Sequence, residues 1–180
     1  MSTRGDRFLT TGGDIEKLLT RCKKCYSITN NGKYVIFHTE LPNLIIPNRK
    51  KVALIVNTTR QNQIGHWFLL IIFKNSRNSQ LFLCDGLGRV EKEPRVMKNI
   101  ELFCKNNNLI FHNYNLKIQT SKSLACGYLI LFFLFKFSIL SLNGFLSLKR
   151  IMIRQSVRTN EKIALKSAKQ HFRILSLWFK

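Results

Sequence analysis

Apolar residues gather in short runs along the chain, and three of these runs predict the β-strands of a buried sheet. Val52–Val56 is a compact apolar strand, and His66–Phe73 is apolar almost throughout. Such a continuous run predicts a strand that is buried on both faces. Leu81–Cys84 follows after a polar turn at Lys74–Gln80, so it predicts the partner strand of a hairpin.

Two further segments have the composition of strands, although their patterns are less regular. Lys33–Glu40 contains the β-branched and aromatic run Tyr34-Val35-Ile36-Phe37. Leu109–Ile118 is rich in apolar and aromatic residues and predicts a further strand. The chain is therefore expected to contain five strands.

Apolar residues at helical spacing predict three amphipathic helices. The first begins at Gly12-Gly13-Asp14, which is typical of an N-terminal cap before Ile15. The second spans Glu91–Asn106. The third spans Arg158–Phe179, where apolar positions alternate with a strongly basic face.

One long apolar segment predicts a buried central helix. Leu124–Phe135 is nearly all apolar, and Lys136 interrupts the run before it reaches the ~20 residues that a membrane-spanning helix needs. Asn143 and Gly144 then break the weaker continuation. We therefore expect a helix inside the protein and no membrane span.

The length and the charge of the chain set limits on the class of protein. A chain of 180 residues without repeats or linkers predicts one domain over 1–180. With 30 Lys and Arg against 9 Asp and Glu, its net charge of +21 favours nucleic acid, an acidic protein or an anionic membrane surface as partner. The monomer is the expected state.

The five cysteines indicate free thiols in a reducing compartment. They are odd in number, irregularly spaced and not preceded by a secretory signal. Cys22 and Cys25 have the CxxC spacing of half a zinc site. No second CxxC or suitably spaced histidine pair completes it, so no metal is expected.

Cys126 and His66 are the candidates for a nucleophile and its base. Cys126 lies where a polar loop meets the central apolar helix, and the dipole at a helix N-terminus stabilises a thiolate. His66 opens a strand directly after a polar loop, which anchors an imidazole beside solvent. Alternatively, Cys126 is a small buried apolar residue and His66 has only a structural role.

Three further residues can complete a catalytic centre. Asp85 ends the strand that pairs with the His66 strand, so its carboxylate can orient the imidazole or simply begin a turn. Gln119 precedes Cys126 by seven residues, and its amide can join the Cys126 backbone N–H as an oxyanion donor. Trp67 can form a wall of the site or belong to the core.

The order of these residues resembles that of a known family. Gly65-His66-Trp67, Asp85-Gly86-Leu87-Gly88, Gln119 and Ala125-Cys126-Gly127 resemble the adenain-like and SUMO-protease-like cysteine peptidases. The likeness is greatest to the adenovirus-type protease and its relatives in Maverick/Polinton elements. Asp85 and its glycine turn follow the SUMO-type pattern, whereas Ala125 follows adenain.

The resemblance implies an α+β fold: a mixed β-sheet packed by helices, with a papain-like core whose central helix carries the nucleophile at its N-terminus. It implies a cysteine endopeptidase that cleaves virion or capsid precursors, with Cys126 as nucleophile, His66 as base and Asp85 as orienter. Gln119 and the Cys126 N–H would bind the oxyanion. No cofactor is needed for the chemistry, although DNA and a peptide are expected activators.

Two alternatives to the endopeptidase remain open from the sequence. One is an isopeptidase that removes a ubiquitin-like protein from conjugates. The other is a basic nucleic-acid-binding protein without catalysis, which the charge alone supports. For the peptidase we expect a protein substrate, association with nucleic acid, and a location inside the cell, in the host nucleus or the virion.

Overall fold

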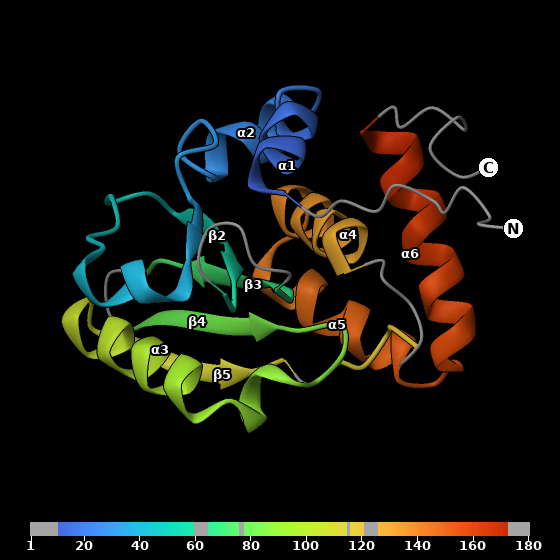
Figure 1. Cartoon of the computed structure of the whole chain (residues 1–180). Coiled ribbons are helices and arrows are strands. Elements are labelled where there is room, and N and C mark those ends of the chain that lie inside the picture. The colour runs from blue at the N-terminus through green and yellow to red at the C-terminus, as the bar shows by residue number, and fades with distance from the viewer. Residues whose placement is uncertain (1–10, 60–64, 76–77, 115, 121–125, 173–180) are drawn as a thin grey trace, which may run out of the picture.

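The computed structural model describes residues 11–59, 65–75, 78–114, 116–120 and 126–172 of the chain. In chain order, its elements are α1 (Gly12–Leu19), α2 (Lys23–Ile28), β1 (Val35–Phe37), η1 (His38–Asn43), β2 (Lys51–Asn57), β3 (Trp67–Phe73), β4 (Ser79–Cys84), η2 (Val90–Lys92), α3 (Pro94–Asn106), β5 (Leu109–Asn113), α4 (Cys126–Ile139), α5 (Leu142–Met152) and α6 (Val157–His171). Figure 1 shows the sheet between helices on both of its sides.

The sheet has five strands in the order β1-β2-β3-β4-β5. The central strands β2, β3 and β4 pair antiparallel, while β1 and β5 pair parallel to their neighbours at the two edges. The predicted fold class, α+β with a mixed sheet packed by helices, is therefore confirmed. The hairpin between β3 and β4 is present, with Leu69 opposite Cys84.

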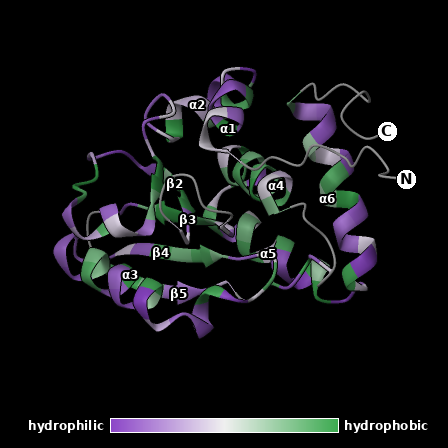
Figure 2. Ribbon diagram, in the orientation of Figure 1, coloured by the Kyte–Doolittle hydropathy of each residue, from purple (hydrophilic) through white to green (hydrophobic). Residues whose placement is uncertain are grey.

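Both faces of the sheet are buried, which explains the continuous apolar runs. Alternate residues of β2 face opposite sides: Ala53 packs with α4, and Leu54 packs with α3 and η1. Two clusters of buried side chains thus form, one on each face of the sheet. In Figure 2 the strands and α4 carry most of the hydrophobic colour, whereas α3 and α6 each show hydrophilic residues.

Helix α4 is the buried helix that the sequence predicted. It begins at Cys126, and every residue from Gly127 to Leu134 is buried. At its other end, the Lys51 ammonium donates to the backbone oxygens of Phe137 (2.9 Å) and Leu140 (2.5 Å). A cation at a helix C-terminus is favourable for the helix dipole. None of the helices in the described part of the chain combines the length and the apolar composition that a membrane span requires.

The first strand and the first helix differ in detail from their predictions. The Lys33–Glu40 strand narrows to β1, and the chain enters the 3₁₀-helix η1 at His38. Thr11 rather than the glycine-rich segment caps α1, because its hydroxyl accepts from the Asp14 N–H at 3.2 Å. Side-chain capping of this kind replaces a hydrogen bond that the first turn lacks.

Two predicted segments of the second half are shorter than expected. The Leu109–Ile118 strand ends at Asn113, because its partner β4 ends at Cys84 and the Gly86 oxygen then accepts from Ile118 and Gln119. The helix predicted over Glu91–Asn106 begins at Pro94, a residue that suits the first turn because it lacks an N–H.

The last two helices also begin and end at other residues than predicted. The break after α4 falls at Leu140–Ser141, where Ser141 caps α5, so Asn143 and Gly144 lie inside that helix. The basic C-terminal helix is α6, which spans Val157–His171. Residues 173–179 of the predicted helix lie outside the described residues.

Candidate active site

Cys126 is the first residue of α4, the position that the sequence predicted. Its side chain is half-buried, and backbone hydrogen bonds with Trp67 and Gly127 favour its charged form. The N-terminus of a 14-residue helix adds the partial positive charge of the helix dipole. A thiol in this position is suited to exist as a thiolate.

His66 is held in place by the end of β2. Its backbone oxygen accepts from the Thr58 N–H at 3.0 Å, and its own N–H donates to the Thr58 hydroxyl at 3.0 Å. These two bonds continue the pairing of Asn57 with Trp67 by one residue beyond the strand. The imidazole therefore projects from a rigid element rather than from a free loop.

Gly65, the residue before His66, lies so close to the side chains of Asn57 and Thr59 that only a residue without a side chain fits there. A Cβ at this residue would lie 1.9 Å from the Asn57 Oδ1 and 2.2 Å from the Thr59 Oγ1, closer than any real contact. The Asn57 carboxamide is itself buried and accepts from the N–H and hydroxyl of Thr59. Thr58 thus positions His66, and Asn57 and Thr59 enclose Gly65, the residue before it. These three residues were not among the predicted site residues, although a run of polar residues at the end of an apolar strand indicates them.

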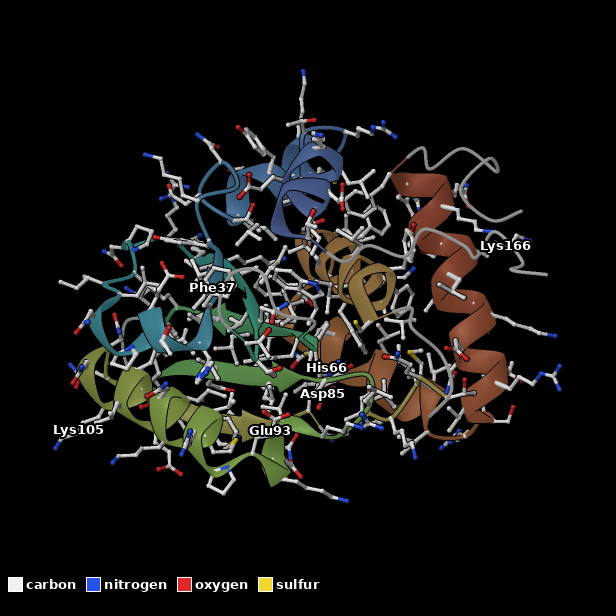
Figure 3. The ribbon with its side chains drawn as sticks, viewed as in Figure 1. Phe37, His66, Asp85, Glu93, Lys105 and Lys166 are labelled. Atoms are coloured by element: carbon white, nitrogen blue, oxygen red, sulfur yellow. The ribbon has the colours of Figure 1, made fainter. Side chains whose placement is uncertain are left out.

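Asp85 accepts four hydrogen bonds, one of them from His66. The His66 Nε2 lies 2.5 Å from the Asp85 Oδ1. The backbone N–H groups of Leu87 (2.9 Å), Arg89 (2.6 Å) and Val90 (2.8 Å) donate to the two carboxylate oxygens. Asp85 thus begins a turn and orients the imidazole at once. Figure 3 shows the two labelled side chains beside the end of β4.

The pKa of Asp85 is lowered by this arrangement. Burial alone would raise it, since only 5% of the side chain is exposed, but the hydrogen bond and charge of His66 and the backbone N–H groups outweigh burial. The carboxylate therefore stays ionised at neutral pH. A fixed anion on Nε2 holds that nitrogen in its protonated form, which leaves Nδ1 as the nitrogen available to Cys126.

The pKa values of His66 and Cys126 shift in opposite directions. Burial works against the charged form of His66, yet the hydrogen bonds to Asp85 and Cys126 raise its pKa to about 9. Burial also works against a Cys126 thiolate, but the hydrogen bond with His66 and the backbone donors lower the pKa of the thiol. At neutral pH the pair therefore favours a thiolate beside an imidazolium.

The backbone of Gln119 lies next to Gly86, the residue that follows Asp85. Its N–H donates to the Gly86 oxygen at 2.9 Å, directly beside Asp85, and its side chain is 1% exposed. The structure thus places Gln119 inside the protein rather than on an exposed loop. Residues 121–125, which connect this segment to Cys126, lie outside the described residues. The oxyanion role of Gln119 stays a prediction.

The backbone of Trp67 is hydrogen-bonded with Cys126, whereas its side chain belongs to the core. The indole is 3% exposed and belongs to the cluster of buried side chains on the α4 face of the sheet. An added Cβ on Gly12 in α1 would lie 3.7 Å from the indole ring. Its predicted role as a wall of the site is not tested by these contacts.

Metal ligands are not grouped in the described part of the chain. No three His, Cys, Asp or Glu side chains lie there close enough to share an ion. The residues brought together are a thiol, an imidazole and a carboxylate, which can carry out nucleophilic attack and proton transfer.

Of the comparisons with known proteins, the one with solved structures gives matches. No family model and no curated protein matches the chain. Among solved structures, the chain is similar to "SUMO protease Ulp1 with the catalytic cysteine oxidized to a sulfinic acid", with 12% identity and a TM-score of 0.40. This similarity covers 83% of the present chain and 77% of that structure.

Proposed function

We propose that this protein is a cysteine endopeptidase with Cys126 as nucleophile, His66 as general base and acid, and Asp85 as the residue that orients His66. The observation that most supports this proposal is the series of contacts from the Cys126 thiol through the His66 imidazole to the ionised, hydrogen-bonded carboxylate of Asp85. Such a chain supplies the nucleophile and the proton that amide cleavage needs.

In the proposed reaction the Cys126 thiolate attacks the carbonyl carbon of the scissile peptide bond. The carbonyl oxygen becomes an oxyanion, for which the Cys126 N–H and the Gln119 amide are the proposed donors. The His66 imidazolium gives its proton to the leaving amine, and a thioester remains on Cys126. Neutral His66 then takes a proton from water, whose oxygen attacks the thioester and releases the acid and the thiolate.

The proposed substrates are precursor proteins of a virion or capsid, which we infer from the resemblance of the His, Asp, Gln and Cys motifs to the adenain-like family. The three side chains supply the chemistry without a cofactor, whereas DNA and a peptide are proposed activators. The proposed place of action is the host nucleus or the virion. The same centre would also serve removal of a ubiquitin-like protein, so a peptide library and a ubiquitin-like conjugate should be assayed side by side.

Selective alkylation tests the proposed centre directly. With iodoacetamide at neutral pH we expect Cys126 to react at least 10-fold faster than the buried Cys84 and Cys104, because only a thiolate is nucleophilic. Mass spectrometry of partly labelled protein gives the rate at each cysteine. Labelling should slow when His66 is replaced by alanine. Equal rates at all cysteines would instead support a nucleic-acid-binding protein without catalysis.

The pH profile of the same two groups follows from their shifts. Alkylation of Cys126 should remain fast at pH values just below the ordinary thiol pKa and decline when the pH falls further and the thiolate is protonated. Peptide cleavage should also decline as the pH rises through about 9, because His66 then lacks the proton for the leaving amine. The raised pKa of His66 also affects folding. The His66–Asp85 pair stabilises the fold fully below the pKa of an unfolded histidine, and this contribution is lost as the pH rises through about 9.

Replacing Gln119 with alanine should separate oxyanion binding from thiolate formation. We expect kcat to fall by about 10²–10³-fold, the scale for loss of one oxyanion donor. Alkylation of Cys126 should keep its rate, because that reaction forms no oxyanion. The matched control is Gln155→Ala, an exposed residue between α5 and α6. A parallel loss of alkylation and turnover would assign Gln119 a structural role only.

The exposed face of α6 supports the proposed association with DNA. Arg158, Lys162 and Lys166 are exposed and recur every four residues, so they lie on one side of the helix. In Figure 3 the labelled Lys166 points away from the rest of the protein. A row of cations displaces counterions from phosphates, and binding of this kind weakens as salt rises.

Replacing Arg158, Lys162 and Lys166 together by glutamine should weaken DNA binding and flatten its salt dependence. The slope of log K against log salt should decrease by about 0.9 for each phosphate that the variant no longer neutralises. Fluorescence anisotropy with a labelled duplex at several salt concentrations gives this slope. The matched control removes three charges from the exposed face of α3, at Arg95, Lys98 and Lys105. An equal effect in the control would mean that DNA responds to net charge and not to α6.

A further inference from the structure

The CxxC pair that the catalytic centre does not use lies at the start of α2. The Cys22 Sγ accepts a hydrogen bond from the Cys25 backbone N–H at 3.4 Å, and the two thiols are hydrogen-bonded to each other. Both are free thiols in this structure. The two thiols thus lie in contact at the first turn of the helix, which a disulfide between them requires.

The two thiols differ in their access to solvent. Cys22 is partly exposed, whereas Cys25 is fully buried and its thiol points to the Ser138 Oγ of α4 at 3.9 Å. Burial, followed by the contact with Cys22, raises the pKa of Cys25. A reagent from solvent therefore reaches Cys22 first, and Cys25 is placed to react with Cys22 alone.

The charges around Cys22 favour an anionic reagent. Arg21, Lys23 and Lys24 flank it and are exposed. Positive charge close to a thiol attracts anionic disulfides. The other cysteines lack this arrangement: Cys84 and Cys104 are buried, and Cys126 is paired with His66.

We propose that Cys22 and Cys25 form a redox-active dithiol that exchanges with small anionic disulfides and closes an intramolecular disulfide. The Cys22 thiolate attacks one sulfur of the disulfide RS–SR and expels one thiolate, which leaves a mixed disulfide on Cys22. The first expelled thiolate takes the proton of Cys25, whose sulfur then attacks the Cys22 sulfur and expels the second thiolate. The two protein thiols are oxidised by two electrons, and RS–SR is reduced to two RSH.

Formation of the disulfide between Cys22 and Cys25 would remove one contact with α4. The Cys25 thiol loses the proton that it donates to Ser138, while the Ser138 hydroxyl keeps its own bond to the Phe135 oxygen at 2.7 Å. The helix α4 therefore keeps its internal bonds. The chemistry at α2 is independent of catalysis at Cys126, so either can be present without the other.

Oxidised glutathione provides the test, in a Cys126→Ser background so that the reactive thiol of the centre does not consume it. Four of the five cysteines remain in that variant. The folded protein is incubated with the reagent, quenched in acid, denatured and alkylated before mass spectrometry. We expect the loss of two alkylation sites and of two hydrogens, with no glutathione attached and the link mapped to Cys22–Cys25.

Two variants make the outcome decisive. Adding Cys22→Ser should restore alkylation of every remaining cysteine, whereas adding Cys104→Ser should leave the link between Cys22 and Cys25 intact. Full alkylation of the parent protein would overturn the proposal. A lasting glutathione adduct on Cys22 would overturn it as well, because Cys25 would then have failed to displace the second thiolate.

Discussion

Cys126→Ser is expected to fold normally and to lose peptide cleavage to the background of the assay. A hydroxyl replaces the thiol with little change of volume, so the start of α4 and the buried run behind it keep their packing. A serine hydroxyl is far harder to ionise than a thiol, and the partners that favour the charged form of Cys126 cannot lower its pKa enough. Turnover of a fluorogenic peptide and the thermal midpoint, measured on the same samples, give both results.

A second cysteine supplies the control for this substitution. Cys104→Ser makes the same chemical change in α3, on the opposite face of the sheet. It should retain full turnover, although burying a hydroxyl can lower its thermal midpoint. Full cleavage by the Cys126→Ser variant would remove Cys126 from the mechanism, whatever the state of the fold.

Asp85→Asn should lower kcat by about 10⁴-fold, the scale known for the same change in a serine protease triad. The carboxamide has one acceptor oxygen for four donors. If this oxygen keeps the Arg89 and Val90 N–H bonds, the NH₂ group faces the His66 Nε2. That nitrogen must then accept, the proton moves to Nδ1, and the imidazole can no longer take a proton from Cys126.

The loss should appear in alkylation as well as in turnover, which distinguishes Asp85 from Gln119. Cys126 in the Asp85→Asn variant should label slowly at neutral pH, because a neutral imidazole of the wrong tautomer does not stabilise the thiolate. Circular dichroism and the thermal midpoint report how far the turn after β4 has loosened. The control is Asp14→Asn, the other aspartate of the described residues, which lies in the first turn of α1. Normal labelling with a normal fold would contradict the orienting role.

The sequence alone was sufficient to predict the sheet and the central helix. The runs at β2, β3 and β4 are apolar at consecutive positions because helices cover both faces of the sheet. The buried helix α4 was recognisable for the same reason. Burial of apolar area is a local property of composition, so a pattern along the chain is enough to indicate it.

The candidate site was predicted as residue types in order, and its geometry was not. Cys126, His66 and Asp85 were chosen because each lies at the end or start of a predicted element. The four hydrogen bonds of Asp85, the steric need for Gly65 and the positioning by Thr58 were not visible. Each depends on segments that the fold, and not the chain order, brings together.

Tertiary contacts also decided where elements end. The strand β5 pairs with β4 only as far as Asn113, opposite Leu83, and β4 ends one residue later at Cys84, although the apolar pattern continues to Ile118. The CxxC spacing was visible in the sequence, but the mutual contact of its thiols depended on the turn into α2. Composition and periodicity thus determined which segments are buried. The tertiary structure alone decided which polar groups meet, because a hydrogen bond requires two specific atoms to come within about 3 Å, and spacing along the chain does not fix that distance.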